Sequence, residues 1–204
     1  MKFISAFGRL GKLILARKCS KRKRHTTEKI NLGKNMIQTL IDEQTISNKI
    51  SELANQISID YANKDLTVII VLNGAIIFAS DLIRKISIPL QVDSFAASSY
   101  INDKSSGVLN IRSQLKLPIE NRHILIIDDI LDTGNSLKSL ISYFNKLHPV
   151  SIKTCVLLNK NIQDKLIEKA DYTGFYIPNK YVVGYGLDSN EYYRNLPYIG
   201  IMVN

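Results

Sequence analysis

One run near the middle of the chain constrains its fold more than any other. Residues 124–127 are Ile-Leu-Ile-Ile, the pattern of a short strand that is buried on both faces. Two carboxylates follow at once, Asp128 and Asp129, and a third, Asp132, precedes a Thr-Gly-Asn-Ser loop over 133–136. Apolar residues then recur at helical spacing, at Leu137, Leu140, Ile141, Phe144 and Leu147. We therefore expect a strand, an acidic sheet edge, a small polar loop and a helix.

This order of elements is typical of an anion-binding site. In open α/β sheets ligands bind at the carboxyl ends of the strands. The glycine and the hydroxyl side chains let backbone N–H groups surround an anion at the start of the helix. The carboxylates beside the loop repel a phosphate, so they are explained if they hold a divalent cation or accept a proton. An alternative for the loop alone is a plain helix N-cap by Asn135 or Ser136.

The rest of the chain alternates apolar strands with amphipathic helices. This alternation indicates an α/β fold with a mainly parallel, twisted sheet flanked by helices. The 204 residues suffice for one such domain, and no apolar run approaches the roughly 20 residues that span a bilayer. Strands are expected at 66–72, 90–98, 107–112, 124–127, 151–158, 181–188 and 199–203, and helices at 46–61, 75–86, 137–147 and, weakly, 162–169.

The net charge of +9 belongs to one end of the chain. Residues 1–35 hold 11 Lys or Arg and one acid, whereas residues 36–204 hold 16 basic and 17 acidic residues. A nearly neutral body argues against nucleic-acid binding by the domain over 36–204. The extension over 1–35 is interpreted as disordered, as a transit peptide, as a membrane-surface helix or as an RNA-contacting arm.

The pattern D-D-x-x-D-T-G-x-S over 128–136 closely resembles the 5-phosphoribosyl-1-pyrophosphate (PRPP) signature of the type I phosphoribosyltransferases. Residues 71–75 are similar to the pyrophosphate-contacting loop of that family, and residues 98–107 to its mobile lid loop. Residues 179–188 and 193–200 resemble the purine-binding hood of the hypoxanthine (hypoxanthine-guanine) enzymes. The resemblance covers 36–204 and implies the type I fold with a small hood subdomain.

The activity that this resemblance implies is purine salvage, in which N9 of hypoxanthine or guanine displaces pyrophosphate from C1 of PRPP to give IMP or GMP. Asp132 matches the residue that exchanges a proton with the base. Lys160 matches the donor to the exocyclic O6, and an ammonium group, which only donates, selects a 6-oxo over a 6-amino group. Mg²⁺ is the implied cofactor, and its matching carboxylates are Asp128, Asp129 and Asp188.

The resemblance also implies a set of substrate contacts. They are Asn73, Gly74 and Arg194 for pyrophosphate, Ser99 and Tyr100 in the lid, Asp129 at the ribose, Thr133, Gly134, Asn135 and Ser136 for the 5′-phosphate, and Lys160, Tyr181 and Val182 for the base. The sequence departs from the family pattern in four places. Asn73 stands where Lys or Arg is usual, Asp128 replaces a Glu, Ser136 replaces a Thr, and the lid loop is one residue shorter.

Two alternatives stay open at this point. One is a xanthine-preferring transferase, and the other is a non-catalytic PRPP-sensing regulator. The resemblance further implies a homo-oligomer, either a dimer or a tetramer, with no requirement for nucleic acid and no transmembrane segment. Cys19 and Cys155 lie far apart, which fits a reducing compartment. We expect a cytoplasmic protein, or an organellar one, in a plastid or mitochondrion, if residues 1–35 are a transit peptide.

Overall fold

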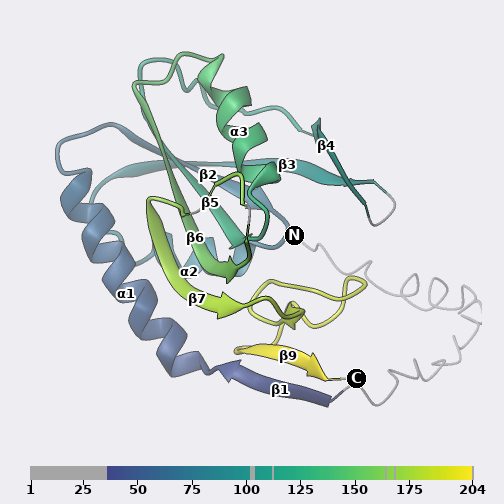
Figure 1. The fold of residues 1–204 in the computed structure, drawn as a ribbon. Helices are drawn as coiled ribbons and strands as arrows, with labels where there is room; N and C mark the ends of the chain where they lie inside the picture. The colour runs from purple at the N-terminus through teal and green to yellow at the C-terminus, as the bar shows by residue number, and fades with distance from the viewer. Residues whose placement is uncertain (1–35, 102–103, 112, 164, 168, 204) are drawn as a thin grey trace, which may run out of the picture. The chain divides into compact units, whose positions relative to one another are not determined.

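The computed structural model describes residues 36–101, 104–111, 113–163, 165–167 and 169–203, with the side chains of residues 36 and 97–111 left out. Their main feature is a six-stranded sheet in the order β4-β3-β2-β5-β6-β7 (Figure 1). Its strands are β2 (Leu66–Leu72), β3 (Leu90–Ile101), β4 (Lys104–Ile111), β5 (His123–Leu131), β6 (Ser151–Asn161) and β7 (Tyr172–Pro178). Five of the strands are parallel, and β4 pairs antiparallel with β3 at the edge. The predicted fold class is confirmed.

Helices cover both faces of this sheet, so its central strands are buried on each side. Helices α1 (Glu43–Asp60) and α2 (Ile76–Ile83) pack on one face, and α3 (Asn135–Asn145) packs on the other. Asp42 caps the start of α1, because its side chain accepts a hydrogen bond from the backbone N–H of Thr45 at 2.8 Å, a favourable N-cap. Within the described residues no helix is long and apolar enough to cross a membrane.

A second, three-stranded antiparallel sheet forms the expected hood. Its strands are β1 (Met36–Ile41), β9 (Ile199–Val203) and β8 (Val182–Val183), in the order β1-β9-β8. The hood therefore joins the first and last described strands of the domain (Figure 1). The sequence did not predict β1, because its pairing with β9 spans most of the chain and leaves no local pattern.

The secondary structure differs from the sequence predictions in four places. No helix forms among the described residues of 162–169. Instead β6 runs on to Asn161, and the chain then follows an irregular path until Ala170 is buried beside α3.

The strand predicted at 181–188 is limited to β8, because the backbone has positive φ at Gly184, Tyr185 and Gly186 and turns back on itself. Strand β7 was missed. Finally, most of the predicted lid loop is strand, since β3 extends to Ile101 and β4 begins at Lys104.

The pairing of β1 with β9 leads to a prediction about truncation. A chain that begins at Met36 retains every strand of the hood, whereas a chain that begins at Asp42 lacks β1 and exposes the edge of β9. We expect the first to melt close to the full-length chain, and the second to melt several degrees lower because it loses the ladder and the buried Ile41. Thermal unfolding followed by circular dichroism measures both. A lower melting temperature for the Met36 chain would mean that residues 1–35 stabilise the domain.

Candidate active site

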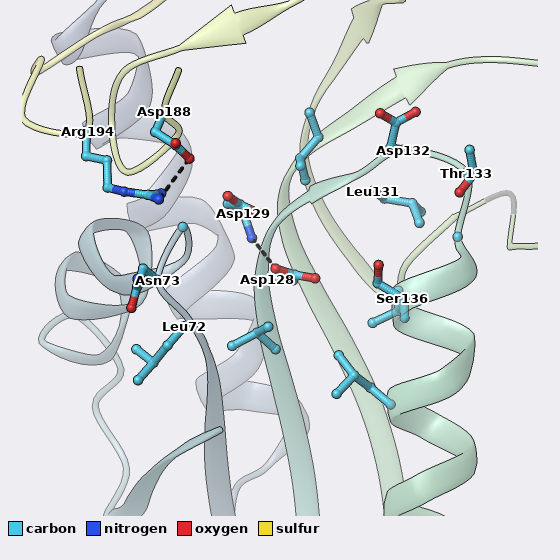
Figure 2. A pocket seen from close by; sticks show the side chains of 16 residues that line it. Leu72, Asn73, Asp128, Asp129, Leu131, Asp132, Thr133, Ser136, Asp188 and Arg194 are labelled. Carbon is cyan, nitrogen blue, oxygen red and sulfur yellow. Dashed lines mark hydrogen bonds and ion pairs between the residues drawn. The ribbon is translucent and has the colours of Figure 1, made fainter. Parts of the chain in front are cut away.

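A cavity of about 270 Å³ opens at the carboxyl ends of β2 and β5. Its walls come from the loop after β2, the end of β5, the first turn of α3 and the segment 188–194. In Figure 2, Asn73, Asp188 and Arg194 line one side of it, and Thr133 and Ser136 line the other. The structure thus brings the predicted loops together at the sheet edge where ligands of α/β proteins bind.

The polar loop before α3 lines this cavity at the start of the helix. Gly134 precedes the helix with a φ of 87°, in the left-handed region, and no side chain caps the helix there. The N–H of Asn135 lies 3.5 Å from the hydroxyl oxygen of Thr133. The first N–H groups of a helix have no partner inside it, and the positive end of the helix dipole adds to their attraction for anions. The loop therefore has the donors that a phosphate group requires.

Two adjacent carboxyl groups lie in the floor of the cavity. The N–H of Asp129 donates to Oδ1 of Asp128 at 2.9 Å. Burial raises the pKa of Asp128, and the neighbouring charge of Asp129 raises it further. Burial also raises the pKa of Asp129, although its hydrogen bond with Asp128 and the charge of Arg194 partly oppose that shift. This excess of negative charge would be balanced by a bound cation.

The described residues contain no group of three or more His, Cys, Asp or Glu side chains arranged to hold a metal ion. Mg²⁺, however, is commonly held by one or two carboxylates together with substrate phosphates and water. The pair formed by Asp128 and Asp129 is of this kind, so the donor set fits a magnesium ion that is shared with a substrate.

The loop after β2 lies directly against the acidic pair. A Cβ atom on Gly74 would lie 1.8 Å from Oδ2 of Asp129, so any larger residue would displace the carboxylate. The preceding peptide bond, between Leu72 and Asn73, is cis. The side chain of Asn73 lines the cavity near Asp129 (Figure 2).

Arg194 is held at the hood side of the cavity by several acceptors. Its Nη2 contacts Oδ1 of Asp188 at 2.9 Å and Oε2 of Glu191 at 2.8 Å, and its Nη1 donates to the carbonyl of Gly186 at 2.9 Å. The guanidinium also lies near enough to Asp129 to influence its ionisation. A planar, multiply bonded guanidinium at this place suits phosphate oxygens.

Asp132 and Lys160 form an ion pair next to the polar loop over 133–136, called the phosphate loop below. Nζ of Lys160 lies 2.9 Å from Oδ2 of Asp132, and their side chains are only 13% and 31% exposed. They come from the ends of neighbouring strands, since Asp132 follows β5 and Lys160 lies near the end of β6. Asp132 lines the main cavity, and Lys160 lines an adjoining polar one. The sequence predicted that both residues contact the purine base, and in the structure the two side chains contact each other.

Two of the described predicted residues, Tyr181 and Val182, do not line the main cavity. Tyr181 is 56% exposed, and its hydroxyl donates to the backbone carbonyl of Asp188 at 3.1 Å. Val182 is buried in the hood, where it pairs with Ile201. The backbone of Ser99 and Tyr100 belongs to β3, and their side chains fall outside the described residues. The expectations for 1–35 also fall outside them.

Two contacting residues escaped the sequence analysis. Glu191 and Asp188 both form ion pairs with Arg194. The one sequence signal for the Glu191 contact is its position three residues before Arg194. Lys165 bonds to the end of β6 through Asn159. The interpretation of 162–169 as a helix concealed this contact, because it assigned Lys165 to a regular element in place of the irregular segment that follows β6.

Comparison with known proteins identifies the family. The phosphoribosyl transferase domain model matches residues 37–190. The hypoxanthine-guanine phosphoribosyltransferase of Bacillus subtilis is 43% identical over 166 residues, which are 81% of this chain and 92% of that protein. The hypoxanthine-guanine-xanthine phosphoribosyltransferase of Tritrichomonas foetus is 39% identical over 81% of this chain and 91% of its own.

Solved structures agree with the sequence relatives. A crystal structure of a hypoxanthine phosphoribosyltransferase from Staphylococcus aureus matches with a TM-score of 0.78 and 41% identity, covering 81% of this chain and 91% of the other. Both the sequence and the arrangement of strands around the cavity therefore agree with one group of proteins. The chain belongs to the phosphoribosyltransferase family, within its hypoxanthine-guanine branch.

Proposed function

We propose that this protein transfers the 5-phosphoribosyl group of PRPP to hypoxanthine, and also to guanine, in purine salvage. The observation that carries the proposal is the contact between Asp132 and Lys160 beside an anion-binding loop. In the reaction the bond from N9 to C1 forms and the bond from C1 to the pyrophosphate oxygen breaks. The proton displaced from the imidazole ring passes to the carboxylate of Asp132, and IMP or GMP is released with pyrophosphate.

The base is recognised by the same two residues. Lys160 donates to O6 of the purine, while Asp132 faces N7 and exchanges its proton. The low exposure of Lys160 strengthens this donor bond, because water competes little for the ammonium group. Adenine carries an amino group at position 6, so its own donor would face the lysine donor. Tyr181 would stack on the purine, and the backbone carbonyl of Val182 would bind its edge.

The phosphates of PRPP are held at the two ends of the cavity. The 5′-phosphate lies against the loop over 133–136 and the start of α3, while Asn73, Gly74 and Arg194 contact the pyrophosphate. Ser99 and Tyr100 close over PRPP and exclude water. Asp128, Asp129 and Asp188 would hold Mg²⁺, and Asp129 would also face the ribose hydroxyls. When bound, the ion offsets the negative charge that grows on the departing pyrophosphate.

The quaternary structure and the compartment follow from the family resemblance alone. We propose a homodimer or homotetramer that acts in the cytoplasm. Size-exclusion chromatography with light scattering tests the first part, and localisation of a tagged full-length chain tests the second. An organellar signal would favour the transit-peptide interpretation of residues 1–35.

The proposed specificity makes a direct prediction. Purified protein with PRPP and Mg²⁺ should form IMP from hypoxanthine and GMP from guanine, with adenine a very poor substrate. A mismatch at a buried donor costs up to about 10⁴-fold in discrimination. Nucleotide formation is followed by ultraviolet absorbance for each base, with xanthine included. Comparable rates with adenine would contradict the assignment of Lys160, and a preference for xanthine would reassign the substrate.

Replacing the proton acceptor separates chemistry from binding. Asp132→Asn keeps the shape of the side chain but cannot take a proton, so we predict a fall in kcat of about 10²- to 10⁴-fold with a much smaller change in the Kd for PRPP. Steady-state kinetics and titration calorimetry measure the two effects. Asp65→Asn is a matched control, because Asp65 is exposed and precedes β2 at the opposite end of the sheet. Near wild-type turnover would make Asp132 a structural residue.

The unusual residue at the pyrophosphate loop gives a third test. Asn73→Lys adds a positive charge to the wall of the cavity, so we predict tighter binding of pyrophosphate, by about 1 kcal/mol after screening by solvent and ions. Product inhibition by pyrophosphate provides the measurement. Asn145→Lys adds the same charge at the exposed end of α3 and should leave this inhibition unchanged. If pyrophosphate binds no tighter to the Asn73 variant, the new side chain points away from the substrate.

A further inference from the structure

Lys165 connects the ends of the two strands that carry Asp132 and Lys160. Its ammonium group donates to Oδ1 of Asn159 and makes a longer contact, 3.5 Å, with the backbone carbonyl of Leu131. Leu131 and Asn159 are opposite each other in the ladder of β5 and β6. Each directly precedes one member of the ion pair, so a single side chain spans the two backbone positions from which the pair projects.

The surroundings of Lys165 strengthen these contacts. Asn159 is only 1% exposed, so its bond with the ammonium group is shielded from water and stronger than a surface bond. Burial lowers the pKa of Lys165, the carboxylate of Asp132 opposes this shift, and the charge of Lys160 adds to it. The ammonium group of Lys165 therefore interacts electrostatically with both members of the pair as well as with the backbone that carries them.

The segment around Lys165 is fixed by separate backbone contacts. The N–H of Leu166 donates to the carbonyl of Thr133 at 3.0 Å. A Cβ atom on Gly134 would lie 2.8 Å from the backbone N of Ile167. These contacts brace the phosphate loop and do not involve the side chain of Lys165. Replacing that side chain should therefore disturb the residues that face the base and leave the phosphate loop in place.

We propose that Lys165 is a positioning residue for base recognition, which keeps the ends of β5 and β6 aligned so that Asp132 and Lys160 face the same purine. The proposal rests on the proposed function, because it assumes that this pair binds the base. It assigns to Lys165 an effect on the base half of the reaction and little effect on the binding of PRPP.

Three variants of the full-length chain test this assignment. Lys165→Met keeps the length of the stem and removes the charge, and Lys165→Arg keeps the charge. Lys169→Met removes the same charge from an exposed position four residues along the same segment. For each variant, steady-state kinetics give kcat and the KM for hypoxanthine, calorimetry with Mg²⁺ gives the Kd for PRPP, and a thermal melt gives Tm.

The expected result is selective. Lys165→Met should lower kcat/KM for hypoxanthine about tenfold while the Kd for PRPP changes less than about twofold, as expected for loss of a buried bond from a charged donor. Lys165→Arg should recover most of the loss, and Lys169→Met should match the wild-type chain. The proposal is wrong if Lys165→Met matches Lys169→Met. It is also wrong if Lys165→Met weakens PRPP and hypoxanthine alike, with a lowered Tm that arginine does not restore. A wild-type chain that forms no IMP would refute the proposed function and this inference with it.

Discussion

The parallel pairing of β5 with β6 is the constraint on which the site depends. Leu131 lies opposite Asn159 in this ladder, and the next residue on each strand is a member of the 2.9 Å ion pair. A slip of one residue would turn one of the two side chains to the other face of the sheet, since successive residues of a strand point in opposite directions. The two strands are packed into the core by fully buried side chains such as Leu125 and Val156, and this packing holds the register. Packing in the core therefore sets the distance between Asp132 and Lys160 at the edge of the sheet.

The cavity contains two acidic side chains, Asp128 and Asp129, whose ionisation lowers the stability of the free domain. Burial and mutual repulsion raise the pKa of Asp128, and burial raises that of Asp129. A group whose folded pKa is raised contributes stability below its unfolded pKa and loses that contribution as the pH rises through the folded value. The acidic pair thus destabilises the empty domain as the pH rises and its two carboxyl groups ionise. A bound cation reverses this effect, because it favours the charged form of both groups. The acidic pair therefore lowers the stability of the free protein and favours the form with a bound ligand.

The sequence predicted the elements whose pattern lies within their own residues, and it did not predict pairings between distant residues. The strand, loop and helix over 123–147 were predictable because each carries its own period and the breaks fall at Asp and Gly. The pairing of β1 with β9 was not, since it joins residues about 160 positions apart. Strand β7 contains Gly174 and ends at Pro178, which weaken a strand pattern. The motifs predicted most of the polar residues that line the cavity. The contacts of Lys165 were not predictable, because they arise where irregular backbone returns to the end of β5 and leave no pattern in the sequence.

The ion pair also bears on how the enzyme selects its base. In the free protein Asp132 and Lys160 satisfy each other at low exposure, so a base that binds between them must compensate both for the contact that it breaks. In the proposed reaction a 6-oxopurine would do so, because its O6 would accept from the ammonium group and its ring N–H would donate to the carboxylate. Adenine offers a donor to the lysine, so it breaks the pair and leaves a partly buried charge without an acceptor. The cost of breaking the contact is the same for both bases, so it cancels from the difference in their binding free energies. Discrimination therefore arises in the bound state, where the ammonium group would have an acceptor with a 6-oxopurine and would face a competing donor with adenine.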